Sequence, residues 1–387
     1  MDVLKFVIIV SLLFAFTQCK NDEIMDDEIS RFRVEHVGDL REQVFSISPE
    51  RVGGMTYILH GELDDDALKG RLLSELKQKG FKIQDSIKVL PMGVPELHAL
   101  VELSVTTIRS SPSHTSSMLS QALMGTPVKV LKKEGGWVFI QTPDKYLGWC
   151  EAGSIHYMNK QEWNTWKSAG RVMVIERSKN LKDLSGEHVV RDLVAGNILE
   201  VMDKAPGGFV VETPDGKVGV VEESQVVPFK ESTFSVPVDI QKVKADALDL
   251  LGTPYLWGGT SVRALDCSGF TKTVYQMNGV ILARDASLQA RHGEAVQVDE
   301  GWQGFDIGDL LFFAPNENSE RITHVGLYIG DSEFIHEAGR VKINSLDSTR
   351  ANYSDYRERT LKQVRRIRGM EDSEGIIPML EHPWYVN

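Results

Sequence analysis

One cysteine in the C-terminal third of the chain has the surroundings of a catalytic nucleophile. Cys267 stands in Asp266-Cys-Ser-Gly-Phe270, and apolar residues with helical spacing follow it through Met277. The start of a helix presents unpaired N–H groups and the positive end of the helix dipole, which favour a thiolate. The thiolate is the form of cysteine that attacks a carbonyl carbon. This position therefore predicts nucleophilic catalysis by Cys267.

Two histidines downstream supply the base that such a nucleophile needs. His324 lies in the alternating run 322–330, which predicts a core strand. Asp331 and Ser332 form a turn, and His336 lies in the strand that follows. Pairing of the two strands brings His336 beside His324, where it can fix the orientation and tautomer of the base.

The remaining polar residues give weaker signals. A single histidine in a strand is more often structural than catalytic, so only the joint Cys–His–His pattern supports catalysis. Four upstream histidines show no metal-ligand spacing, and no paired-carboxylate site is evident, so neither a metal nor another cofactor is expected. These histidines are His60, His98, His114 and His156. Cys150 follows Gly148-Trp149 and is interpreted as a small buried hydrophobe.

Local elements around Cys267 are predicted to position it. Asp239 to Leu251 has a helical apolar stripe, with Asp239 as the N-cap and Gly252 as the stop. Three glycines, Gly258, Gly259 and Gly269, allow backbone and substrate to approach the cysteine closely.

Taken together these motifs resemble those of the NlpC-type family of cell-wall cysteine peptidases. The resemblance covers about residues 236 to 368 and rests on five motifs. They are Tyr255-x-Trp257-Gly-Gly, Asp266-Cys267-Ser268-Gly269-Phe270, Gly308-Asp309-Leu310, His324-Val-Gly-x-Tyr328 and His336. It implies a papain-like α+β domain over 231–370, in which Cys267 attacks, His324 acts as base and then acid, and His336 orients His324.

Two upstream segments resemble each other and bacterial SH3-like domains. Residues 100–158 and 170–230 each contain short alternating strands separated by Gly, Pro and Asp turns. The stretch Trp163–Trp166 between them is predicted to be a helical connector. With these two domains the chain resembles peptidases of the dipeptidyl-peptidase VI type, γ-D-glutamyl-L-diamino acid endopeptidases. By that resemblance the bond cut joins the D-glutamate γ-carboxyl to meso-diaminopimelate or L-lysine in a muropeptide or peptidoglycan stem peptide.

The resemblance also implies a set of substrate-binding residues. They are Tyr255, Trp257, Asp266, Ser268, Ser287 and Tyr146. Asp266 is expected to pair with the free amine of an N-terminal L-alanine, and Tyr146 to close the site from the first SH3-like domain. Peptidases of this type can supply another acid near Gly-x-Pro, where this sequence has Thr126. That departure weakens the expectation of strict selection for L-alanyl ends.

The N-terminus is interpreted as a lipoprotein signal peptide over residues 1–19. Lys5 precedes an apolar run, Phe6–Phe16, that is about right for a signal and short for a membrane span. Cys19 is the predicted lipidation site, although Gln18 departs from the small residue usual before such a cysteine. The predicted location is the cell envelope, on a membrane through a lipid anchor, periplasmic or at the outer surface. The alternative is a cleaved signal and free secretion.

The rest of the predicted organisation is a tether over 20–53, a small α/β unit over 54–95 and a C-terminal tail over 371–387. A net charge of −12 over 387 residues argues against a nucleic-acid partner, because phosphate binding needs a basic face. Three other functions stay open: an endopeptidase on intact peptidoglycan, a non-catalytic wall-binding lipoprotein, and acyl transfer to an amine on the same scaffold.

Overall fold

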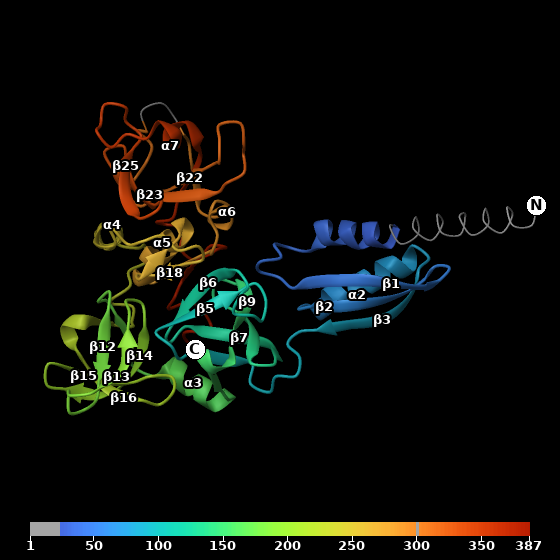
Figure 1. The fold of residues 1–387 in the computed structure, drawn as a ribbon, viewed down its shortest axis with the longest axis horizontal. Helices are drawn as coiled ribbons and strands as arrows, with labels where there is room; N and C mark the ends of the chain where they lie inside the picture. The colour runs from blue at the N-terminus through green and yellow to red at the C-terminus, as the bar shows by residue number, and fades with distance from the viewer. Residues whose placement is uncertain (1–23, 299–301) are drawn as a thin grey trace, which may run out of the picture. The chain divides into compact units, whose positions relative to one another are not determined.

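The computed structural model describes residues 24–298 and 302–387, and the chain divides into two compact units, residues 1–94 and 95–387 (Figure 1). The predicted signal peptide and Cys19 lie outside the described residues. Within the described ranges, no helix is long and apolar enough to cross a membrane.

The first unit contains the predicted β-α-β arrangement. Its elements are β1 (Phe45–Gly53), β2 (Thr56–Leu63), α2 (Asp66–Gln78) and β3 (Lys82–Val89). β2 and β3 are parallel, and β1 pairs antiparallel with the other side of β2. Asp65 accepts hydrogen bonds from the backbone N–H groups of Ala67 and Leu68 and so caps α2.

The predicted tether over 20–53 is wrong from residue 24 onward. Residues 24–36 form a helix, and β1 follows it. Met25, Ile29 and Phe32 are buried in the core of this unit. Their i, i+4 and i+7 spacing marks one apolar helix face, which the many charged residues between them obscure in the sequence.

The two SH3-like segments have the same topology. The first sheet runs β10-β4-β7-β8-β9-β5-β6, and the second runs β17-β11-β14-β15-β16-β12-β13 when read from the matching edge. The strands of the first are β4 (His98–Val101), β5 (Val105–Arg109), β6 (Met118–Leu123), β7 (Pro127–Glu134), β8 (Trp137–Gln141), β9 (Leu147–Glu151) and β10 (Ile155–Met158). The strands of the second are β11 (Arg171–Val174), β12 (Lys179–Lys182), β13 (Val189–Leu193), β14 (Ile198–Ala205), β15 (Gly208–Glu212), β16 (Val218–Glu222) and β17 (Val226–Pro228). A short 3-10 turn precedes the last strand of each, η1 (Ala152–Ser154) and η2 (Glu223–Gln225).

The connector between the two domains is the predicted helix, α3 (Lys160–Ser168). Asn159 and Glu162 form a capping box at its N-terminus. The C-terminal segment, predicted as a tail, packs into the same region: β27 (Ile376–Pro378) pairs with β20 (Val280–Leu282), and Tyr385 is buried in one cluster with the α3 tryptophans. Segment 371–387 is therefore part of the core, because its apolar residues find partners far away in the sequence.

The peptidase domain combines helices with a six-stranded sheet, the predicted α+β class. The helices are α4 (Ile240–Asp249), α5 (Cys267–Met277), α6 (Ala286–Gln289) and α7 (Asp355–Thr360). The sheet order is β21-β26-β22-β23-β24-β25, with bounds β21 (Glu294–Val296), β22 (Leu310–Phe313), β23 (His324–Gly330), β24 (Glu333–Glu337), β25 (Val341–Ser345) and β26 (Leu361–Arg366). A two-stranded ribbon, β18 (Thr260–Ser261) and β19 (Ala264–Leu265), leads into α5. Asp239 caps α4, as predicted.

Candidate active site

Cys267 is the first residue of α5, at the predicted helix start. Its neighbour Asp266 is the N-cap and accepts a hydrogen bond from the backbone N–H of Gly269 at 2.7 Å. A side chain at Gly269 would place its Cβ 1.9 Å from the carbonyl oxygen of Gly259, so only glycine allows this tight approach. The thiol is half-buried against the domain core.

The ionisation of the thiol differs from the sequence expectation. Burial, and secondarily the charge of Asp266, raise the pKa of Cys267 to about 11, although hydrogen bonds from the backbone N–H groups of Val325 and Ser268 lower it. The N-cap carboxylate that starts the helix also offsets its positive end, so the helix does not produce a free thiolate. The thiol is therefore neutral in the unliganded site and needs a base to remove its proton.

The two histidines meet as the sequence predicts. Nε2 of His324 lies 2.7 Å from Nδ1 of His336. The approach depends on Gly326, which lies opposite His336, because a Cβ there would come within 3.1 Å of the His336 Cβ. Nε2 of His336 in turn contacts Oδ1 of Asn344 on β25 at 2.9 Å, and Nδ2 of Asn344 donates to the carbonyl oxygen of Asn352.

This chain of contacts assigns a tautomer to each ring. Because the carbonyl of Asn352 can only accept, Asn344 presents its oxygen to His336, and Nε2 of His336 must carry the proton. Nδ1 of the neutral His336 ring is then an acceptor, so Nε2 of His324 donates to it. Nδ1 of His324 is left without a proton and can act as a base. Asn344 is a residue that the sequence reasoning missed.

Both rings are held neutral by their surroundings. Burial is the largest cause that lowers the pKa of His324 well below its usual value, and the cations of Arg357 and Lys342 add to it. Burial also lowers the pKa of His336 to about 3, against the opposing effect of the hydrogen bond that its ring donates to Asn344. A neutral imidazole can take up a proton from a neutral thiol when the thiol attacks.

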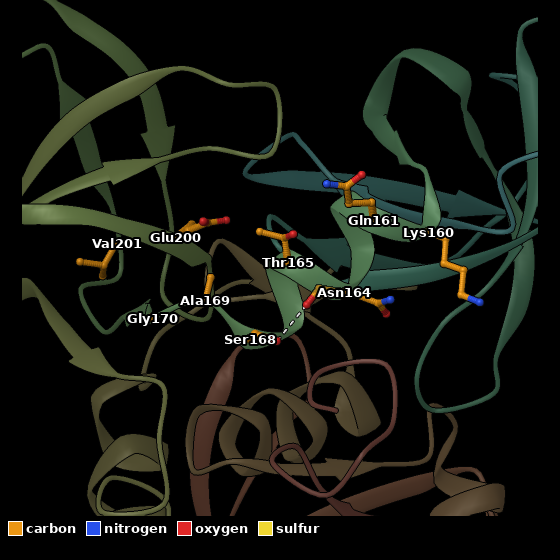
Figure 2. Close-up of a pocket in the computed structure, with 9 residues that line it drawn as sticks. All are labelled: Lys160, Gln161, Asn164, Thr165, Ser168, Ala169, Gly170, Glu200 and Val201. Atoms are coloured by element: carbon orange, nitrogen blue, oxygen red, sulfur yellow. Dashed lines mark hydrogen bonds between the residues drawn. The ribbon is translucent and has the colours of Figure 1, made fainter.

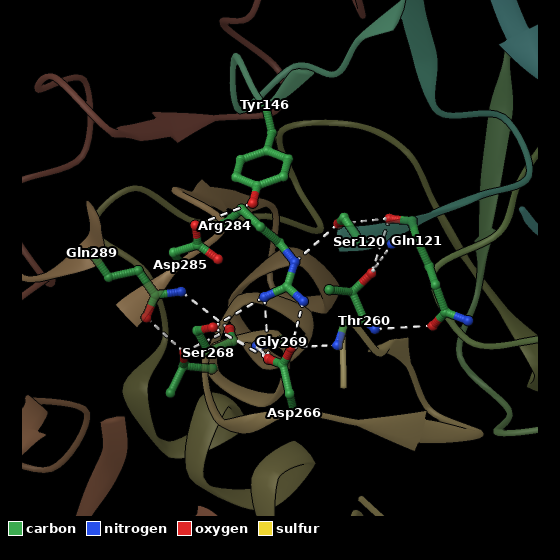
Figure 3. Close-up of polar contacts among 12 residues, drawn as sticks. Ser120, Gln121, Tyr146, Thr260, Asp266, Ser268, Gly269, Arg284, Asp285 and Gln289 are labelled. Atoms are coloured by element: carbon green, nitrogen blue, oxygen red, sulfur yellow. Dashed lines mark hydrogen bonds and ion pairs between the residues drawn. The ribbon is translucent and has the colours of Figure 1, made fainter. Parts of the chain in front are cut away.

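A buried arginine joins the cysteine loop to the first SH3-like domain (Figure 3). The guanidinium of Arg284 donates to both carboxylate oxygens of Asp266 and to the hydroxyl of Ser268 at 3.0 Å. Its Nε donates to the hydroxyl of Ser120 on β6 at 3.0 Å. Arg284 is only 1% exposed, so this ion pair is shielded from water. A lone arginine within the apolar stretch 280–288 was the available sequence signal.

The role expected for Asp266 does not fit this geometry. Its carboxylate accepts from Arg284, from Ser268 and from the backbone N–H groups of Gly258 and Gly269. Ser268 is buried in the same network. These contacts occupy the lone pairs that a substrate amine would need, so Asp266 shapes the cysteine loop from beneath.

A second carboxylate lies where the first SH3-like domain meets the peptidase domain. The hydroxyl of Tyr146 donates to Oδ2 of Asp285 at 3.1 Å. The Tyr146 ring packs against Ala283 and Leu288, and Asp285 is half-buried at the start of α6. Tyr146 therefore does reach the peptidase domain, and it brings with it an acid that the sequence reasoning missed.

The other predicted binding residues are distributed around this loop. Tyr255 is 41% exposed, and burial together with the charges of Cys267 and Asp266 raises its pKa to about 12. Trp257 is 69% exposed, and Ser287 is half-buried on α6. Thr126 is buried and hydrogen-bonds to Tyr385 of the C-terminal segment.

A surface hollow lies elsewhere, between α3 and β14 (Figure 2). Its lining includes Lys160, Asn164 and Glu200, and no cysteine or histidine. It therefore has no nucleophile or base of the kind described above. In the described ranges no group of three or more His, Cys, Asp or Glu residues could hold a metal ion.

Comparison with known proteins agrees with this arrangement. Residues 252–366 match the NlpC/P60 family and residues 104–156 match the bacterial SH3 domain. The chain is 33% identical over 251 residues to a γ-D-glutamyl-L-lysine dipeptidyl-peptidase of Bacillus subtilis, covering 64% of this chain and 80% of that protein. The chain belongs to the NlpC/P60 family. It is thus a cysteine peptidase with SH3-like domains, of the fold class that the sequence predicts.

Two further comparisons with this NlpC/P60 peptidase cover nearly the whole length of the matched protein. A dipeptidyl-peptidase 6 of Lysinibacillus sphaericus is 27% identical over 272 residues, covering 66% of this chain and 94% of that protein. The crystal structure of an NlpC/P60 family protein from Bacillus cereus superposes with a TM-score of 0.61 at 23% identity, covering 70% of this chain and 99% of that one. This last similarity supports the shared fold.

Proposed function

We propose that the protein hydrolyses the bond between the γ-carboxyl of D-glutamate and an L-diamino acid in short peptidoglycan peptides that carry a free N-terminal L-alanine. The observation that carries the chemistry is the hydrogen-bonded series His324, His336 and Asn344, which leaves Nδ1 of His324 unprotonated. The Cys267 thiol accepts a hydrogen bond from the backbone N–H of Val325, the residue next to His324. The substrate class is the one named for the Bacillus subtilis relative.

The reaction proceeds through a thioester. Nδ1 of His324 removes the proton of the Cys267 thiol, and the sulfur attacks the γ-carbonyl carbon of D-glutamate. The imidazolium then gives this proton to the amine of the leaving diamino acid, and the C–N bond breaks. Water, deprotonated by the same imidazole, hydrolyses the thioester and releases L-Ala-D-Glu. His336 and Asn344 hold His324 in the tautomer that each step requires.

The amine of L-alanine is placed at Asp285 and Tyr146. A carboxylate pairs with an ammonium group through charge-assisted hydrogen bonds, and the tyrosine hydroxyl fixes its orientation. Asp285 directly follows Arg284, whose side chain contacts the cysteine loop, so the acid belongs to a segment that borders this loop. Because Tyr146 belongs to the SH3-like domain, that domain limits how much chain can extend beyond the alanine.

Mass spectrometry of L-Ala-γ-D-Glu-meso-diaminopimelate tests this function. The wild type is expected to release L-Ala-D-Glu from the free peptide and little from its N-acetylated form, and Cys267→Ala is expected to release none. Activity that survives Cys267→Ala would overturn the mechanism. Equal cleavage of the free and N-acetylated peptides would leave the assignment of the nucleophile intact and would contradict the proposed selection for a free amine.

The variant Asp285→Asn tests whether Asp285, and not Asp266, binds the amine of L-alanine. It should lower kcat/KM for the free amine about tenfold or more and bring the free and acetylated peptides closer together. An unchanged ratio would exclude Asp285 as the selector. Side-by-side digestion of purified sacculi and free tripeptide distinguishes the alternative function, since an endopeptidase on intact peptidoglycan would release fragments from both.

Anchoring through Cys19 is a separate proposal, which rests on the sequence pattern alone. Metabolic labelling with a fatty acid analogue should modify the wild type and leave Cys19→Ser unlabelled. A wild type that is unlabelled and found in the culture medium would favour the secreted alternative.

A further inference from the structure

A half-buried arginine near the histidine pair has no acidic partner among the described residues. Arg357 lies on α7, with its guanidinium carbon 5.3 Å from the centroid of the Phe313 ring and 5.1 Å from that of Tyr356. In the described part of the chain no carboxylate forms an ion pair or hydrogen bond with this guanidinium. Its neighbour on the same helix, Arg359, pairs with both Asp355 and Glu317.

The position of Arg357 relates it to the catalytic base. Phe313 and His324 are cross-strand partners on β22 and β23, and their ring centroids are 5.8 Å apart. The Phe313 ring therefore has the imidazole and the guanidinium as neighbours. The charge of Arg357 also contributes to the low pKa values of His324 and His336 and acts on Cys267, which places the cation within electrostatic range of all three side chains.

A second cation lies near the histidine pair. Lys342 lies directly opposite His336 across β24 and β25, so the two side chains share one face of the sheet. No ion pair of Lys342 with a carboxylate occurs among the described residues. The reaction requires protonation of the His324 base, and two cations near the imidazole pair make this protonation unfavourable. An anion bound near these cations would offset the effect.

The side of the site on which Arg357 lies indicates which anion this is. The acyl half of the substrate extends from Cys267 toward Asp285 and Tyr146 under the proposed function. His324 must reach the leaving nitrogen to protonate it, so the leaving group lies on the histidine side. The diamino acid that leaves carries an α-carboxylate when it is the last residue of the peptide.

We propose that Arg357 binds the free α-carboxylate of the leaving L-diamino acid, so that the peptidase selects peptides ending at that residue. This deepens the proposed function and rests on it. A bound carboxylate also offsets the cation next to His324, so substrate binding makes the base easier to protonate. Peptides extended by a further residue, as in longer stem peptides, lack this carboxylate at the same place.

Three peptides test the assignment on the full-length protein. They are L-Ala-γ-D-Glu-L-Lys, the same peptide with its lysine carboxyl amidated, and the same peptide with D-isoglutamine in place of D-glutamate. The wild type should prefer the free lysine carboxylate to the amide by about tenfold to a hundredfold in kcat/KM, the range for a charge-assisted hydrogen bond. Arg357→Gln should reduce this preference to less than about threefold, and Arg357→Lys should restore part of it.

The ratio between substrates keeps the test informative if Arg357→Gln also slows the chemistry, because a general loss affects every peptide equally. Arg359→Gln on the same helix is the matched control and should keep the wild-type ratio. The proposal would be overturned if Arg357→Gln still preferred the free lysine carboxylate to its amide as strongly as the wild type does. It would also be overturned if Arg357→Gln instead lost a preference of the wild type for D-glutamate over D-isoglutamine, because Arg357 would then bind the acyl half of the substrate. Failure of the wild type to cleave any of the three peptides would instead overturn the proposed function, and the carboxylate assignment with it.

Discussion

The two SH3-like domains contain nearly the same turn and use it differently. In the first domain the turn is Thr142-Pro-Asp-Lys-Tyr146, and in the second it is Thr213-Pro-Asp-Gly-Lys217. Both are closed by the same two backbone hydrogen bonds: the N–H of the first residue donates to the carbonyl oxygen of the fifth, and the N–H of the fourth donates to that of the first. The fourth residue has a positive φ in each, 64° at Lys145 and 78° at Gly216. The backbone is thus conserved between the repeats while the side chains diverge.

The side chains of the first turn enter the peptidase domain. Asp144 forms a buried ion pair with Lys272 of α5 at 3.0 Å, and Tyr146 binds Asp285. In the second turn, Asp215 pairs with Arg191 of its own domain and Lys217 lies half-exposed beside it. The first repeat contacts the segment next to the cysteine loop, and the second contacts the peptidase domain elsewhere, as Arg177 does with Thr253. A repeated fold therefore does not imply a repeated function.

The largest difference is expected when the arginine at each interface between an SH3-like domain and the peptidase domain is replaced by methionine. Arg284→Met leaves the Asp266 carboxylate buried without its partner, and we expect a loss of about 3 to 5 kcal/mol in stability together with loss of activity. Arg177 is exposed and contacts only neutral oxygens in the peptidase domain, so Arg177→Met should cost about 1 kcal/mol and leave activity intact. Denaturant unfolding and peptide cleavage measure both. Equal losses in the two variants would contradict the comparison.

The aspartates of the two turns provide a smaller contrast. Asp144→Ala leaves Lys272 charged in a buried position and should lower stability by about 3 kcal/mol. Asp215→Ala removes a partly exposed pair, for which we expect about 1 kcal/mol. The unfolding midpoints of the two variants, measured against the wild type at one pH, give the comparison. A larger shift for Asp215→Ala would show that the second turn is the more important one for stability.

Substitutions at the fifth residue of each turn, Tyr146 and Lys217, test the effect of the turns on activity. Tyr146→Phe removes the hydrogen bond to Asp285 and should lower kcat/KM for the free-amine peptide about threefold to tenfold. Lys217→Met at the equivalent position should leave it unchanged. The acetylated peptide is the control, because it lacks the ammonium group and should respond little to either change.

The pH dependence of stability tests a buried group of the peptidase domain that belongs to neither turn. Burial raises the pKa of Glu337 to about 7, and the carboxylate of Asp266 adds to the effect. The folded protein therefore binds this proton more tightly than the unfolded chain. The stabilisation is fully present below the unfolded pKa and is lost as the pH rises through about 7. Glu337→Gln should lie close to the wild type in stability at pH 5 and unfold at a higher temperature than the wild type at pH 8. The buried histidines are common to both proteins and cancel in the difference. An identical pH dependence would contradict the assigned pKa.

The sequence predicted the local parts of this site well. The helix that begins at Cys267, the strand that carries His324, the turn at Asp331 and the contact of His336 with His324 all follow from short-range periodicity and capping. The same holds for the β-α-β unit and for the repeated SH3-like topology. Such features depend on residues within about a dozen positions of one another, where backbone geometry leaves few choices.

Only the tertiary structure decided which polar groups pair and which stay available for substrate. Arg284 pairs with Asp266, Asn344 fixes the histidine tautomers, and Arg357 stacks on Phe313 with no acidic partner among the described residues. The packed helix over 24–36 and the packed segment 371–387 are of the same kind, since their apolar faces find partners through the fold. Periodicity shows that a side chain is buried, but the charge balance of a site depends on which distant residues meet there. For this protein the sequence determined the class of chemistry, and the long-range packing determined the pKa values of the site and which of its polar groups pair with one another.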